Sequence, residues 1–111
     1  MATYYSSLPQ TFAALSDPTR LAVVEQLVRG PASVTQLSEP FDMARPSFLK
    51  HLRVLEDAGL VTSAKVGRVR TVTLQLSALN GVESWVQMHR KKAEERLDRL
   101  GEFLEEEQKH D

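Results

Sequence analysis

The side chains with the clearest chemical potential are the cations between residues 44 and 70. This block holds six cations and two acids, a net charge of +4. The cations are Arg45, Lys50, Arg53, Lys65, Arg68 and Arg70. Because salt screens charge beyond roughly 8–10 Å, such a patch attracts phosphate groups even on a molecule that is neutral as a whole. We therefore expect this block to face a phosphate-bearing partner.

The charge of the whole chain hides this block. The 111 residues carry a net charge of −1, which by itself argues against a partner as acidic as DNA. Residues 94–111, however, hold eight acids and three cations, a net charge of −5. The partition predicts an orientation, with residues 44–70 towards the phosphates and residues 94–111 away from them.

The composition excludes several classes of protein. The chain has no cysteine, so a disulfide framework, thiol catalysis and a cysteine metal cluster are ruled out. We find no Ser-His-acid spacing, no carboxylate pair in an apolar setting and no glycine-rich phosphate loop, so we expect neither an enzyme nor a cofactor. The first residues, MATYYSSLPQ, lack the basic and apolar regions of a secretory signal, which favours a cytoplasmic protein.

Helical spacing of apolar residues predicts four helices in the first half of the chain. The first covers residues 8–15, and the second begins at Asp17-Pro18, a capping pair, with Leu21, Val24, Leu27 and Val28 as its apolar stripe. Ser33 caps a short third helix, with Gln36 as capping-box partner. The fourth runs from Pro46 to a C-terminal Gly59. Its expected buried residues are Leu49, Leu52, Val54, Leu55 and Ala58.

Beyond Gly59 the apolar period changes from helical to alternating. Residues 60–66 and 69–76 read as strands joined by Gly67-Arg68, with Val72, Leu74 and Leu76 on one face. Ser77 is the expected cap of a last helix from Leu79 to about Glu107. The order predicts a mostly α fold with a small β-hairpin, a winged helix-turn-helix (α-α-α-α-β-β-α). We expect one domain over residues 1–104 and an acidic tail over 105–111.

Two motifs make the chain similar to a known family. Residues 15–21, Leu-Ser-Asp-Pro-Thr-Arg-Leu, resemble a signature of the arsenic-repressor (ArsR/SmtB) family of bacterial transcription regulators. Residues 47–61, which include Lys50-His51-Leu52, resemble its recognition helix, and Gly67-Arg68 fits its wing. The resemblance implies a sequence-specific DNA-binding regulator, a repressor that acts as a homodimer on a palindromic operator.

The chain departs from the family pattern at two places. Ala44 stands where a capping Ser often precedes the recognition helix, which costs about 0.5–2 kcal/mol of capping energy. The metal-sensing members carry Cys or His pairs on the third or last helix. Here residues 34–39 offer only Glu39, and the last helix offers only His89 and His110. The resemblance therefore implies no metal response through the usual family sites.

The same resemblance places the DNA contacts on three elements. In the recognition helix we expect Arg45, Ser47, Phe48 and His51 near base edges, with Lys50 and Arg53 near phosphates or bases. The start of the preceding helix contributes Ser33, Thr35 and Gln36. The wing contributes Lys65, Arg68 and Arg70. Alternatives are a core position for Phe48, simple capping by Ser33, and wing charges that only discourage sheet aggregation.

The last helix carries apolar residues at spacings of three and four and needs a partner to cover them. These residues are Val82, Trp85, Val86, His89, Ala93, Leu97, Leu100 and Leu104. In the family the first and last helices build a two-fold dimer, which Tyr4, Tyr5, Leu8 and Phe12 would join. The alternative is a helix that folds back on its own domain.

Two questions remain open from the sequence. The fold could serve as a protein-interaction module that no longer binds DNA, although the retained cations argue against this. The effector could be a small apolar molecule between the dimer helices, a partner protein, pH acting through His89, or nothing. We expect no catalytic or metal-binding role for His51, because no second ligand is near it in sequence.

Overall fold

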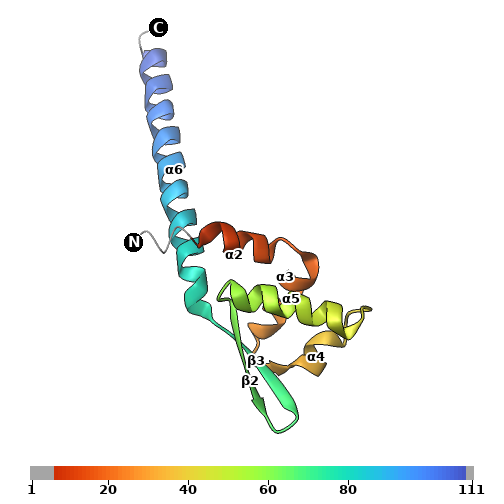
Figure 1. The fold of residues 1–111 in the computed structure, drawn as a ribbon. Coiled ribbons are helices and arrows are strands. Elements are labelled where there is room, and N and C mark those ends of the chain that lie inside the picture. The colour runs from red at the N-terminus through yellow and green to blue at the C-terminus, as the bar shows by residue number, and fades with distance from the viewer. Residues whose placement is uncertain (1–6, 110–111) are drawn as a thin grey trace. The chain divides into compact units, whose positions relative to one another are not determined.

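The computed structural model describes residues 7–109, which are mostly helical with one small antiparallel sheet (Figure 1). The elements are α2 (Leu8–Leu15), α3 (Pro18–Leu27), β1 (Ala32–Ser33), α4 (Val34–Ser38), α5 (Arg45–Asp57), β2 (Val61–Val66), β3 (Val69–Leu74), the 3₁₀ helix η1 (Leu76–Leu79) and α6 (Asn80–Lys109). This order confirms the predicted winged helix-turn-helix. The chain divides into two compact units after Gly81. The first holds the helix-turn-helix and the wing, and the second is the remaining length of α6.

The N-terminus of α3 forms as the sequence predicts. The carboxylate of Asp17 accepts a hydrogen bond from the backbone N–H of Arg20 at 3.1 Å, and Pro18 occupies the first turn. The side chain thus satisfies one of the N–H groups that a helix start leaves without a partner.

The buried face of α3 differs from the predicted stripe. Val23, Val24 and Leu27 are buried, whereas Leu21 and Val28 are exposed. Apolar residues surround this helix on more than one side, so their spacing alone could not select the face that packs on the core. The prediction was wrong for Leu21 and Val28.

Capping explains the bounds of α4 and α5. Ser33 and Gln36 form the predicted capping box, with each side chain bonded to the other residue's backbone N–H. Ala44, the N-cap of α5, provides no side-chain hydrogen bond. At the other end, Gly59 adopts a φ of +76°, and the N–H of Leu60 reaches the carbonyl of Leu55 at 3.0 Å. This is a Schellman ending, which favours glycine because of the positive φ.

The core side of α5 consists of Phe48, Leu52 and Leu55, spaced by four and three residues. Leu49 and Val54, which we predicted to be buried, are 42% and 39% exposed. They lie on either side of the buried stripe, because each is about one residue's rotation of 100° from a buried position. The exposed side chain of Leu49 lines a groove between α5 and the wing.

The sheet has three strands in the order β1-β3-β2, one more than the hairpin we predicted. The added strand, β1, is only two residues long, and Ala32 and Ser33 pair with Val72 and Thr71 of β3. The predicted turn is confirmed, with Gly67 at a φ of +64°. Figure 1 shows the β2–β3 hairpin extending beyond α4 and α5 as a wing.

The segment after β3 also differs from prediction. The strand ends at Leu74, and residues 76–79 form η1, so Leu76 leaves the sheet and is 65% exposed. The last helix therefore begins at Asn80, not at a cap provided by Ser77, and it continues through Lys109. None of the helices within residues 7–109 is long and apolar enough to cross a membrane.

A single apolar core holds the first unit together. It joins α2, α3, α4, α5 and the sheet, with Phe48, Leu37, Leu55, Leu60, Val23 and Val72 as its largest fully buried side chains. Burial of this kind is the main favourable term in folding. It fixes α5 and the wing against the same core, and so places their polar faces relative to each other.

Candidate nucleic-acid interface

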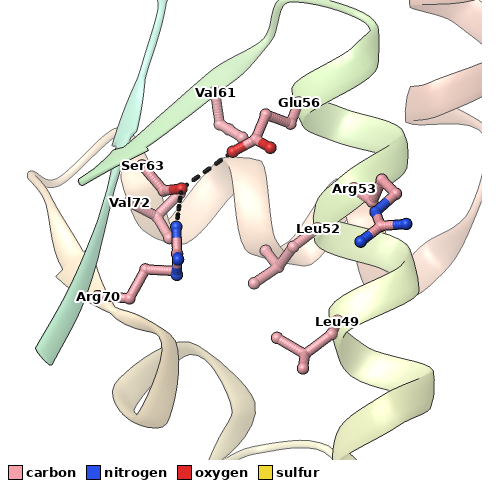
Figure 2. A pocket seen from close by; sticks show the side chains of 8 residues that line it. All are labelled: Leu49, Leu52, Arg53, Glu56, Val61, Ser63, Arg70 and Val72. Carbon is pink, nitrogen blue, oxygen red and sulfur yellow. Dashed lines mark hydrogen bonds between the residues drawn. The ribbon is translucent and has the colours of Figure 1, made fainter. Parts of the chain in front are cut away.

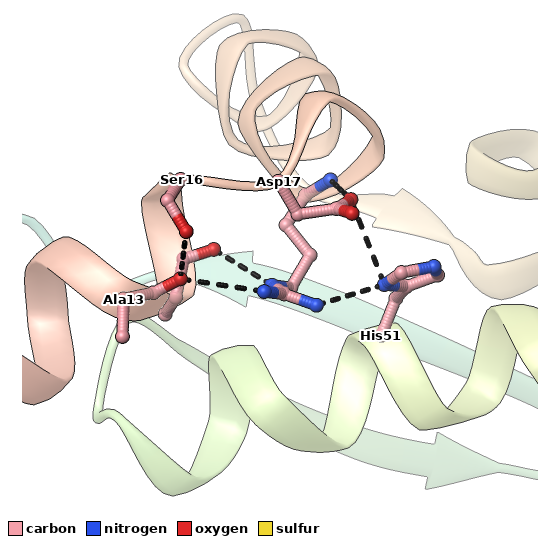
Figure 3. A network of polar contacts seen from close by, with 6 residues as sticks. Ala13, Ser16, Asp17 and His51 are labelled. Atoms are coloured by element: carbon pink, nitrogen blue, oxygen red, sulfur yellow. Dashed lines mark hydrogen bonds and ion pairs between the residues drawn. The ribbon is translucent and has the colours of Figure 1, made fainter.

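The Asp-Pro-Thr-Arg motif links α2, α3 and α5 through the side chain of Arg20 (Figure 3). Its Nε donates to the carbonyl of Ala14 at 2.7 Å, and its Nη2 donates to the carbonyl of Ala13 at 3.3 Å. Its Nη1 lies 3.0 Å from Nδ1 of His51 on α5, and the Asp17 carboxylate lies 3.7 Å from the same nitrogen. The motif therefore anchors the recognition helix α5 to the α2–α3 turn.

This network sets the hydrogen-bonding roles of His51 and Asp17. Because a guanidinium can only donate, the short contact to Arg20 requires Nδ1 of His51 to accept, which places the neutral ring's proton on Nε2. The hydrogen bond from the backbone N–H of Arg20 lowers the pKa of Asp17, desolvation opposes this, and the nearby charge of the Arg20 guanidinium lowers the pKa further. The contacts with Arg20 and Asp17 both use Nδ1 of His51, which leaves its Nε2 outside this network.

A basic groove lies between α4, α5 and the wing. It has a volume of about 380 Å³ and brings together Arg45, Lys65, Arg68 and Arg70 with the hydroxyl residues Ser33 and Thr35. Val34, Leu49 and Val69 complete its lining, so none of the residues that line it is acidic. The structure thus gathers six of the twelve predicted contact residues around one concave surface.

A second groove, which we call the hairpin groove, lies between α5 and the base of the wing (Figure 2). Its volume is about 410 Å³, and its lining includes Leu49, Arg53, Glu56, Ser63 and Arg70. Leu49 and Arg70 line both grooves. Arg53 and Arg70 were predicted from the sequence. Glu56 and Ser63 were missed, because an acid in a basic block is not an expected DNA contact and no spacing marks Ser63 as functional.

Phe48 is a correction to the predicted contact set. Its side chain is 1% exposed, and its ring stacks on Phe41 with centroids 5.8 Å apart. A ring buried in this way cannot reach a thymine methyl group. The alternative prediction, a core position, is the right one.

Three further predicted contacts lie outside both grooves. Ser47 and Lys50 are exposed on α5, and Gln36 is exposed on α4. The amide oxygen of Gln36 already accepts a hydrogen bond from the backbone N–H of Ser33 at 2.9 Å, and its amide nitrogen can donate to a partner. Whether these three side chains contact DNA stays a prediction.

The predicted dimer residues fall into several groups. Tyr4 and Tyr5 lie outside the described residues. Leu8 is 7% exposed within its own chain, so little of its side chain is left for a second copy to cover. This burial argues against the predicted dimer contact of Leu8. Phe12 is exposed, as are Trp85, Val86, His89, Ala93, Leu97, Leu100 and Leu104 on α6, whereas Val82 is half-buried. Phe103, which was missed from the sequence, is 56% exposed and extends the same apolar side of α6.

No cluster of three metal-ligating side chains forms within residues 7–109. His89 lies against the indole of Trp85, with ring centroids 4.5 Å apart. That contact is between two rings of one helix turn and assembles no ligand set. His110 lies outside the described residues.

The helix-turn-helix of this chain matches that of known regulators. Residues 15–64, from the end of α2 into β2, match a family model described as a helix-turn-helix domain. HTH-type transcriptional regulator Rv2034 of Mycobacterium tuberculosis is 38% identical over 79 residues, which cover 71% of this chain and 73% of that protein. A crystal structure of an ArsR family transcriptional regulator is 46% identical, with a TM-score of 0.77, and the match covers 80% of this chain and 92% of the other. The chain belongs to the ArsR family.

The family assignment confirms the predicted class of function. This ArsR-family chain is a DNA-binding regulator of transcription and not an enzyme. A further relative, the arsenical resistance operon repressor of Bacillus subtilis, is 34% identical over 76 residues, covering 68% of this chain and 72% of that protein. The basic groove brings together four of the six cations of residues 44–70 with the hydroxyl residues Ser33 and Thr35.

Proposed function

We propose that this ArsR-family regulator represses transcription as a homodimer on a palindromic operator, which it binds through the basic groove. The observation that supports the groove most strongly is its charge, because four cations from α5 and the wing line it without an acid. Arg45, at the first turn of α5, would read a guanine through its two-pronged donor. Lys65, Arg68 and Arg70 would bind phosphates along the wing, and His51 would donate from Nε2.

Repression is proposed from the named function of the relative in Bacillus subtilis, which is an operon repressor. A repressor needs only to occupy its operator tightly enough to exclude the transcription machinery. It would act in the cytoplasm, where a bacterial operator is found.

The homodimer is proposed from the apolar side of α6. Leu97, Leu100, Phe103 and Leu104 are between 53% and 66% exposed, although they are large and apolar. A second copy of the same helix would cover them and remove their area from water. Two-fold symmetry would then place two recognition helices about 34–36 Å apart, one helical turn of DNA, which matches two inverted half-sites.

Sedimentation and binding measured together test this proposal. We expect the wild-type chain to sediment as a dimer and to bind a duplex, enriched by the protein from a randomised pool, as one dimer per duplex. Leu100→Glu with Leu104→Glu should yield a monomer with weaker binding, whereas Glu102→Lys, on the opposite face of α6, should remain dimeric. A monomeric wild-type chain that binds the enriched duplex with full affinity would contradict the homodimer.

We also propose that the chain does not sense metal through the usual family sites and needs no cofactor. The absence of cysteine from the sequence supports this, as does the lack of Cys or His in residues 34–39. The expected result is equal affinity for the enriched duplex in excess EDTA and in excess Zn²⁺. Release of the duplex by Zn²⁺ at a concentration that leaves the fold intact would contradict it.

A further inference from the structure

Glu56, Ser63 and Arg70 form a chain of two hydrogen bonds that joins the recognition helix to both strands of the wing (Figure 2). The hydroxyl of Ser63 donates to Oε1 of Glu56 at 3.0 Å and accepts from Nη1 of Arg70 at 3.0 Å. A hydroxyl can donate one hydrogen bond and accept another at the same time, so Ser63 connects the carboxylate of Glu56 to the guanidinium of Arg70. We call this chain of hydrogen bonds the relay. Glu56 is therefore linked to Arg70 without touching it.

The strand register places Arg70 opposite another cation, and the relay acts against the resulting repulsion. Arg70 is directly opposite Lys65, and Ser63 is two residues from Lys65 on the same face of the sheet. Like charges in directly opposed positions repel each other, which would drive the Arg70 side chain away from the wing. Within residues 7–109, no carboxylate lies within salt-bridge distance of either cation. The bond to Ser63 is thus what directs the guanidinium of Arg70 over the face of the hairpin.

Arg70 stands at the junction of the basic groove and the hairpin groove, and it lines both. The relay occupies one of its five N–H donors, which leaves four for a phosphate. A guanidinium held in place before binding loses less side-chain freedom when a partner arrives. The carboxylate of Glu56, by contrast, repels phosphate and cannot itself hold the DNA backbone. Its position beside the proposed DNA-binding surface is therefore better explained by an effect on the orientation of Arg70.

We propose that Glu56 is a positioning residue that acts through Ser63 to hold Arg70 in place for the DNA backbone. The inference rests on the proposed use of the basic groove. Neither Glu56 nor Ser63 needs to contact DNA. Their effect is on how well Arg70 is aligned, so it should appear with the enriched duplex and be much smaller with a scrambled duplex of equal length, where fixed alignment matters less.

A double-mutant cycle in the full-length chain tests the proposal. We expect Ser63→Ala to weaken binding of the enriched duplex by about fivefold, within the range of couplings between neighbouring residues, and to cause no further loss in an Arg70→Ala background. Ser63→Thr, which keeps the hydroxyl, should restore wild-type binding. Glu56→Gln keeps an acceptor for Ser63 and should preserve discrimination between the two duplexes, whereas Glu56→Ala should reduce it.

The outcomes separate this inference from the proposed function. An equal loss from Ser63→Ala with and without Arg70 would overturn the relay, as would no loss in the wild-type background. If Ser63→Ala is silent while Arg45→Ala still weakens binding, the relay fails and the basic groove stands. If neither substitution changes binding of the enriched duplex, the groove itself is the wrong surface. Thermal melting of each variant shows whether a loss comes from unfolding.

Discussion

Nη1 of Arg20 lies 3.0 Å from Nδ1 of His51, and this contact joins the family's two sequence motifs in space. Arg20 lies in the first turn of α3, whereas His51 lies 31 residues later on the recognition helix. The contact ties the turn between α2 and α3 to the recognition helix. It sets the tautomer of His51 and fixes one side of α5.

Asp17 should contribute to stability mainly as a helix cap. We expect Asp17→Ala to lower the free energy of unfolding by about 0.5–2 kcal/mol, because the N–H of Arg20 loses its acceptor. Asp17→Asn, which keeps an oxygen at the same place, should cost much less. Urea unfolding followed by circular dichroism measures both, and equal losses for the two variants would show that the charge, not the cap, is what matters.

The lowered pKa of Asp17 predicts a pH dependence. The folded chain holds this pKa below the unfolded value of about 3.9. The stability that the ionised carboxylate of Asp17 contributes is therefore fully present above a pH of about 3.9, and it is lost as the pH falls through the folded pKa. The wild-type chain should therefore lose stability relative to Asp17→Asn as the pH is lowered from about 5 to about 3. Parallel urea midpoints for the two proteins over this range would contradict the shift.

Ala44 is an opportunity to stabilise the recognition helix. Its backbone already has the extended conformation of an N-cap, with φ −65° and ψ 147°, but its side chain offers no acceptor. We expect Ala44→Ser to raise the free energy of unfolding by about 0.5–2 kcal/mol. Ala44→Val, which also lacks an acceptor, is the matched control. A gain that is equal in both variants would rule out capping as its cause.

Phe48 should behave as a core residue. Truncation by Phe48→Ala should cost about 3–5 kcal/mol of folding stability, because it leaves a cavity in a fully buried site. Phe48→Leu should keep most of the stability and should bind the enriched duplex like wild type. Loss of binding in a folded Phe48→Leu variant would contradict the core assignment and would indicate that the Phe48 ring contacts DNA.

Much of this fold follows from local sequence signals. The cap at Asp17, the capping box at Ser33 and the glycine ending at Gly59 were all predictable, because each depends on residues within one helix turn of one another. The wing was predictable as well, because alternating apolar residues on both sides of Gly67-Arg68 are typical of a two-stranded hairpin. These signals are local, so no knowledge of the packing is needed to read them.

The predictions that were wrong or missing concern features that tertiary packing determines. Spacing could not tell whether Leu21 or Val23 would face the core, nor that Leu49 would line a groove while Phe48 was buried. Strand β1 is too short to have a pattern of its own, and it forms only because β3 provides a partner. The relay from Glu56 to Arg70 depends on how α5 packs against the wing, which the sequence pattern does not specify.

The central claim is that the cations of the basic groove bind DNA phosphates and bases. The most direct test measures affinity for the enriched duplex against salt concentration, for wild type and for Arg45→Ala with Arg68→Ala. We predict a steep wild-type dependence, and for the double variant weaker binding with a log–log slope reduced by about one, since the phosphate contact of Arg68 is lost along with the base contact of Arg45. An unchanged affinity and slope in a folded double variant that sediments like wild type would contradict this claim.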